Sequence, residues 1–149
     1  MKTNVSVPLW RTTAILIARF IFAGLFIMAA SFKFLDMDST ASQIASAGFP
    51  FPVPLGWIAA VFESALAVCF LTGAFFSEAC LLAAAYVCFL ALAFHGPTRW
   101  SGNQTEFGFF IDHFTFVAGL LFAAVNGPGR TLTLSQKLVG KSHTDTVNP

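Results

Sequence analysis

The chain has 149 residues, of which 56% are hydrophobic and 10% are charged. Ordinary soluble domains carry about 25% charged residues, and a soluble domain of this length cannot bury so much apolar surface. The sequence therefore excludes an ordinary soluble domain and indicates an integral membrane protein. With eight basic and seven acidic residues, the chain has no charge excess that would attract nucleic acid, and we expect no such partner.

Four long apolar stretches predict membrane-spanning helices. They cover residues 13–35, 54–76, 79–95 and 107–125, close to the length of about 20 residues that crosses a hydrocarbon core of about 30 Å. Backbone groups in lipid must be hydrogen-bonded within the protein, and the alternation typical of barrel strands is absent. The predicted fold is an all-α, integral membrane four-helix bundle. The first stretch is longer than the apolar core of a signal peptide, so we interpret it as a membrane helix.

The basic residues predict the orientation of this bundle. We expect an N-terminal segment at 1–12, a transmembrane domain at 13–127 and a polar tail at 128–149. Five basic residues lie on the side of the termini: Lys2, Arg11, Arg130, Lys137 and Lys141. Only Lys33 and Arg99 lie on the opposite side. The positive-inside rule therefore predicts that both termini are cytoplasmic. We expect a multi-pass protein of a bacterial cytoplasmic (inner) membrane. The end of the tail is expected to be disordered.

A short interfacial helix is predicted between the first two spans, at residues 41–47. Small and mildly apolar side chains favour a helix lying at the membrane surface. Its expected N-terminal caps are Asp38, Ser39 and Thr40. Gly48 and the three prolines that follow it are expected to end the helix.

Cys69, Cys80 and Cys88 lie in apolar runs and form no CxxC pair. We interpret them as small buried side chains, with no disulfide and no metal site.

Ionisable side chains within the spans are the candidate functional residues, because they are costly in a bilayer. They are Arg19, Lys33, Glu63, His95, Asp112 and His113. At 1.5 Å per residue, every predicted span places one in the outer half of the membrane, whereas Arg19 starts about 9 Å from the inner end. Lys33 and His95 lie near span ends, where a long side chain can also reach water.

Glu63 lies about 14 Å from the outer end of its span, too deep for its short side chain to reach water. It is expected to be protonated or paired with Arg19, Lys33 or a histidine. Asp112 and His113 are adjacent and point about 100° apart on a helix. We expect Asp112 to pair with Lys33 or His95, and His113 to face a neighbouring helix or a partner subunit.

The order of several short motifs resembles the DoxX family of small four-helix membrane proteins, over about residues 19–138. The matching features are Arg19 and Gly24, Lys33-Phe34-Leu35-Asp36, Ala47-Gly48-Phe49-Pro50, Glu63 with Gly73 ten residues later, His95, Gly119-Leu120-Leu121 and Gly127–Arg130. Two features differ from the family pattern. Ala29-Ala30-Ser31-Phe32 replaces a turn that often contains glycine, and Asp112-His113 replaces a basic residue followed by asparagine.

The resemblance implies a membrane subunit of a redox system, such as thiosulfate:quinone oxidoreductase or a terminal oxidase. On this hypothesis Glu63 and His95 are the catalytic residues, Arg19, Lys33, Asp112 and His113 form the surrounding polar cluster, and quinone is the non-covalent cofactor. The sequence carries no haem or iron–sulfur motif, so the chain is not expected to be catalytic alone. It would need a partner redox subunit or form a homo-oligomer. The alternatives are a non-catalytic anchor or assembly factor, and a small transporter or lipid-binding protein.

Overall fold

The computed structural model of the protein describes residues 8–129 and 132–133. In chain order the elements are α1 (Leu9–Leu35), α2 (Met37–Ser46), α3 (Pro52–Thr72), α4 (Phe76–His95), the short 3-10 helix η1 (Pro97–Arg99) and α5 (Gln104–Asn126). The described residues contain no strand. Four helices, α1, α3, α4 and α5, are long and apolar enough to span a membrane. The predicted all-α bundle is therefore confirmed. Residues 1–7 and most of the predicted tail lie outside the described residues.

The short helix α2 begins earlier than the sequence suggested, at Met37 instead of residue 41. Asp36 is its N-cap, because the Asp36 carboxylate accepts a hydrogen bond from the Ser39 backbone N–H at 2.9 Å. The same residue ends α1. One aspartate therefore turns the chain out of the first span and directly into α2.

The turn between α3 and α4 depends on Gly73. Its φ is +69°, and a Cβ added there would lie 2.8 Å from the Thr133 side chain and 3.1 Å from the Arg19 guanidinium. Only glycine combines this backbone conformation with so close an approach. The turn joins the ends of α3 and α4 tightly, and it places them next to the last described residues.

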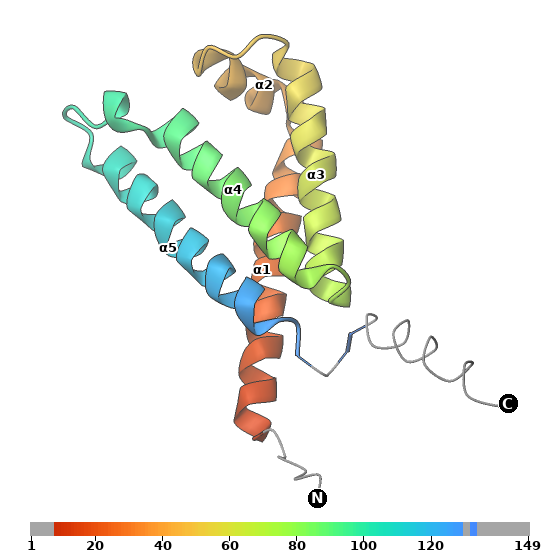
Figure 1. The fold of residues 1–149 in the computed structure, drawn as a ribbon. Helices are drawn as coiled ribbons and strands as arrows, with labels where there is room; N and C mark the ends of the chain where they lie inside the picture. The colour runs from red at the N-terminus through yellow and green to blue at the C-terminus, as the bar shows by residue number, and fades with distance from the viewer. Residues whose placement is uncertain (1–7, 130–131, 134–149) are drawn as a thin grey trace, which may run out of the picture.

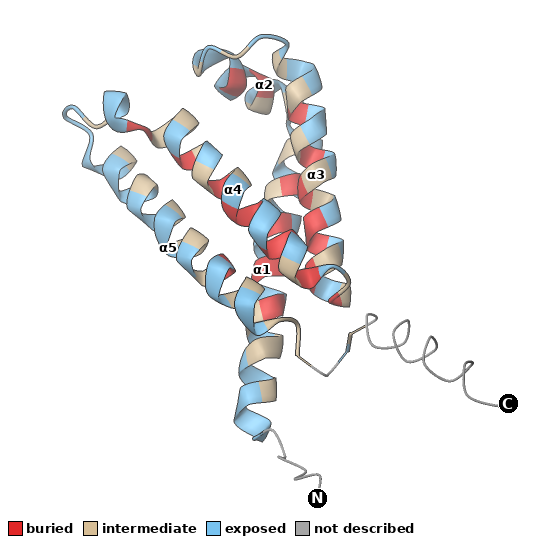
Figure 2. Ribbon diagram, viewed as in Figure 1, coloured by how far each residue is buried: buried red, intermediate tan, exposed pale blue. Residues whose placement is uncertain are grey.

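The spans pack as two pairs, α1 with α3 and α4 with α5. Figure 1 shows that α3 and α4 meet at the Gly73 turn and diverge toward the opposite end, which we call the α2 end because α2 lies there. The buried residues concentrate where α1, α3 and α4 converge, whereas α5 is largely exposed (Figure 2). Aromatic contacts within this core join α1 to α3 and α5, through Phe22 and Phe26 against Phe70 and Phe116.

Candidate functional site

The centre of the site is an ion pair between Lys33 of α1 and Glu63 of α3. Lys33 Nζ lies 2.8 Å from Glu63 Oε1, and the lysine also donates to the Ala29 carbonyl at 3.3 Å. Tyr86 of α4 donates its hydroxyl to the same Glu63 oxygen at 2.8 Å. Three different spans thus meet at one carboxylate. This confirms the expectation that Glu63 is paired, and Lys33 is the partner.

Glu63 is 1% exposed, and its second carboxylate oxygen, Oε2, has no hydrogen-bond partner among the described residues. Glu63 lies about 16 Å along α3 from Pro52. A buried carboxylate with one saturated and one unsatisfied oxygen is unusual, because buried polar atoms are normally hydrogen-bonded. Lys33 compensates the negative charge of Glu63, but the Oε2 atom of the carboxylate is left without a hydrogen-bond donor among the described residues.

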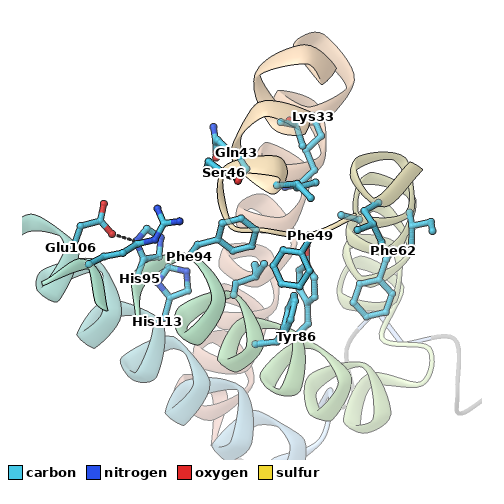
Figure 3. Close-up of a pocket in the computed structure, with 18 residues that line it drawn as sticks. Lys33, Gln43, Ser46, Phe49, Phe62, Tyr86, Phe94, His95, Glu106 and His113 are labelled. Atoms are coloured by element: carbon cyan, nitrogen blue, oxygen red, sulfur yellow. Dashed lines mark hydrogen bonds and ion pairs between the residues drawn. The ribbon is translucent and has the colours of Figure 1, made fainter. Parts of the chain in front are cut away.

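A large cavity of about 710 Å³ is lined by residues of all five α-helices, and Lys33 and Tyr86, the two partners of Glu63, are among them. Most of its lining is apolar, with aromatic side chains from the α2–α3 connection, α3 and α4: Phe49, Phe62, Tyr86, Phe89 and Phe94. Lys33 reaches the same cavity from the end of α1 (Figure 3). Such a volume suits a lipid-soluble ring compound, since ligand pockets are commonly about 300–1,000 Å³ and mostly apolar.

A second polar group lies on another side of this cavity, at the α2 end of α4 and α5. His95 Nδ1 and Glu106 Oε2 are 2.7 Å apart. The rings of His95 and His113 have centroids 5.1 Å apart, and both residues line the cavity (Figure 3). The carboxylate fixes the imidazole of His95, because the Nδ1–H donates to it and leaves Nε2 for another partner.

Asp112 lies elsewhere than expected. It is exposed on α5, whereas Lys33 pairs with Glu63 and His95 pairs with Glu106. The expected pairing of Asp112 with Lys33 or His95 is therefore wrong. The neighbouring His113 lines the cavity instead, on a side of α5 about 100° from Asp112.

Arg19 lies at the opposite end of the bundle from this cavity. It is 2% exposed, and its guanidinium donates to the carbonyls of Phe70 and Leu71 at 3.1 and 2.8 Å. It also donates to the carbonyls of Pro128 and Leu132 at 3.3 and 3.0 Å. Phe70 is about 10 Å along α3 from Glu63. Arg19 thus binds the last carbonyls of α3 and the segment after α5.

Sequence reasoning missed two site residues, Tyr86 and Glu106. Tyr86 is the only tyrosine in the chain and lies in an otherwise apolar run. A lone hydroxyl in such a run needs a hydrogen-bond partner, and this could have indicated a contact with a buried polar group. Glu106 fell outside the predicted fourth span, which was expected to begin at residue 107. The helix begins at Gln104, because the Asn103 side chain caps it by accepting from the Glu106 N–H at 3.3 Å.

Comparison with known proteins identifies the family. The DoxX family model matches residues 14–96, more than half of the chain. The protein belongs to the DoxX family, and with its four apolar spans it is a multi-pass membrane protein. No curated protein and no solved structure matches the chain. The matched region covers most of α1 and all of α2, α3 and α4. It therefore includes Lys33, Glu63, Tyr86 and His95, but not α5.

Proposed function

We propose that this protein is the quinone-binding membrane subunit of a redox system. The observation that carries the proposal is the aromatic cavity of about 710 Å³, whose lining includes Lys33 and Tyr86, the two side chains that bind the buried Glu63 carboxylate. A quinone has an apolar tail, a flat ring and two carbonyl oxygens that accept hydrogen bonds. The aromatic side chains fit the ring, and the polar groups on two sides of the cavity fit the carbonyls.

Lys33 is the side chain best placed to donate to a quinone carbonyl. Its ammonium has three N–H donors, of which two serve Glu63 and Ala29. Among the described residues this leaves one N–H for a ligand in the cavity, which Lys33 lines. His95 lines another side of the same cavity, and its Nε2 donates to a quinone carbonyl in the protonated ring, in which both ring nitrogens carry a hydrogen. Glu63 itself lies behind Lys33 and Tyr86, so its role is to hold them and to exchange protons with them.

The bound quinone would supply the electron-accepting chemistry, and a partner would supply the electrons. The sequence carries no haem or iron–sulfur motif of its own. Within α5 Leu120 is the only buried residue, and Asp112 is exposed on this helix. A carboxylate on the outer surface of a membrane span requires a polar partner. We assign this face of α5 to a transmembrane helix of the partner that carries a basic or hydrogen-bond-donating side chain.

The test is quinone binding by the purified protein in lipid nanodiscs. Ala59 lines the cavity, so Ala59→Phe is expected to fill it and to abolish binding of a short-chain quinone. Ala118 is exposed on α5, and Ala118→Phe is the matched control that should bind as the wild type does. Equal binding by both variants, or no binding by the wild type, contradicts the proposed function.

A second candidate, a non-catalytic anchor, is favoured by one observation. Lys33, Glu63 and Tyr86 join three spans through a single buried carboxylate, as a purely structural contact would. In that case Glu63→Gln should weaken the fold or its assembly with a partner, and quinone should not bind even to the intact protein. A Glu63→Gln variant that remains folded but binds quinone less tightly supports the redox function instead.

A further inference from the structure

The large cavity is only partly enclosed, and the exposed residues of its lining belong to two chemically different groups. Gln43 and Ser46 of α2 and Arg99 of η1 are exposed and polar. Ile58 of α3 and Phe89 of α4 are exposed and apolar. The cavity therefore has a polar opening at the α2 end of the bundle and a separate apolar opening between α3 and α4.

The two residues of the apolar opening lie at the same depth in the bundle. Ile58 follows the start of α3 at Pro52 by six positions, and Phe89 precedes the end of α4 at His95 by six positions. Each residue is therefore about 9 Å from the α2 end of its helix. Both helices are about 30 Å long, which is the thickness of the hydrocarbon core, so this level lies within the lipid. The apolar opening consequently faces lipid and not water.

Two aromatic contacts bound the apolar opening along the helix direction. Toward the α2 end, Phe49 of the α2–α3 connection reaches α4, with its ring centroid 5.7 Å from that of Phe89. On the deeper side, Phe62 of α3 and Tyr86 of α4 meet edge to face at 5.2 Å (Figure 3). Tyr86 also donates to Glu63. The opening therefore leads from the lipid directly to the polar group of the site.

We propose that the apolar opening between α3 and α4 holds the isoprenoid tail of the bound quinone and admits the quinone from the lipid. This inference rests on the proposed function, and it narrows the ligand class to quinones that carry a long apolar tail. With the ring at Lys33 and the tail between Ile58 and Phe89, the tail contacts apolar side chains and lipid along its whole length. A tail in the polar opening would lie beside Gln43 and Arg99 and meet water, which is unfavourable for apolar surface.

A variant that obstructs the apolar opening separates the tail from the ring. Ile58→Trp places a large side chain in the opening, whereas the contacts of the ring with Lys33 and His95 are unchanged. Val61→Trp is the matched control. Val61 is exposed on the same helix, lies about 60° around it from Ile58 and is not part of the cavity lining.

Binding is measured in lipid nanodiscs with two probes, a benzoquinone without a tail and the same benzoquinone with a decyl tail. Affinities are expressed per mole of lipid, so that the stronger partitioning of the tailed probe into lipid does not count as binding. Ile58→Trp is expected to weaken binding of the decyl quinone about tenfold and to leave the tail-less quinone unchanged. Val61→Trp should bind both probes as the wild type does. Unchanged binding of the decyl quinone by Ile58→Trp, or an equal loss of both probes, would overturn the separate tail site.

Photo-crosslinking of the wild-type protein locates the tail without any substitution. The probe is the decyl quinone with a diazirine at the end of its tail, and the labelled residues are identified by peptide mass spectrometry. We expect labels on α3 and α4 at and around Ile58 and Phe89, and excess decyl quinone should suppress them. Labels confined to α1, α2 or α5 would overturn the inference while quinone binding itself stands. If neither quinone binds to the wild-type protein, the proposed function fails, and the tail site fails with it.

Discussion

Lys33 and Glu63 form an ion pair of 2.8 Å between α1 and α3, with side chains that are 21% and 2% exposed. The lysine thus lies at the boundary of the large cavity, while the carboxylate lies fully inside the protein. This asymmetry gives the two residues different roles. Lys33 can contact a ligand directly, and Glu63 acts on the ligand only through its neighbours.

Removing Lys33 alone should lower the free energy of unfolding more than removing Lys33 and Glu63 together. Lys33→Met leaves the Glu63 carboxylate buried without its cation, and we expect a loss of about 3 kcal/mol in the free energy of unfolding. The double variant Lys33→Met/Glu63→Leu should recover most of this loss, since it leaves no unpaired charge. Equilibrium unfolding in mixed micelles measures both. A double variant no more stable than Lys33→Met would argue against a direct charge pairing.

Tyr86→Phe should weaken ligand binding. It removes one hydrogen bond to Glu63, worth about 1 kcal/mol, and we expect quinone affinity to fall about fivefold. Titration with a short-chain quinone measures the effect. Phe122→Leu is the control, because Phe122 is 75% exposed on α5 and should leave affinity unchanged. Unaltered affinity in Tyr86→Phe would show that the hydroxyl does not position the site.

Arg19 should contribute to the stability of the fold and not to ligand binding. Arg19→Gln cannot supply the hydrogen bonds that now reach four carbonyls on two segments. We expect a loss of about 3 kcal/mol, because several buried acceptors lose a charged donor together. Thermal unfolding followed by circular dichroism tests this. Quinone affinity measured below the unfolding transition should stay at the wild-type value, and a selective loss of affinity would instead place Arg19 in the binding site.

Asp112 should matter only for assembly. Asp112→Asn removes the exposed charge on α5 and is expected to weaken capture of the partner subunit about tenfold, the effect of one lost buried charge contact of about 1.4 kcal/mol. Native mass spectrometry of the co-purified complex measures this. Leu121→Ala is the control, because Leu121 is exposed on the same helix but lies about 180° around it from Asp112. Equal capture by Asp112→Asn and the wild type would show that this face of α5 contacts lipid alone.

Much of the fold was predictable from the sequence because the number and type of spans follow from apolar length. The pairing of Glu63 was also predictable, since a deep carboxylate needs a cation. The rotation of α5 was not. A span that faces lipid on most sides has apolar residues around its whole circumference, so the pattern does not reveal whether Asp112 or His113 points inward. Tyr86 was missed because it lies in an equally apolar span, whose pattern does not show which side faces the other helices. Glu106 was missed because the Asn103 cap starts α5 at Gln104, before the predicted start at residue 107.

The contact between Lys33 and Glu63 also bears on how the chain enters the membrane. Lys33 precedes Glu63 by thirty positions in the printed sequence, so its cation is synthesised before the acidic span emerges from the ribosome. When α3 is inserted, its counterion is already present at the end of α1, and the carboxylate need not cross into lipid alone. Tyr86 arrives last, with α4. The order of synthesis therefore places the cation of Lys33 in the membrane before the Glu63 carboxylate, and the carboxylate before the Tyr86 hydroxyl that binds it.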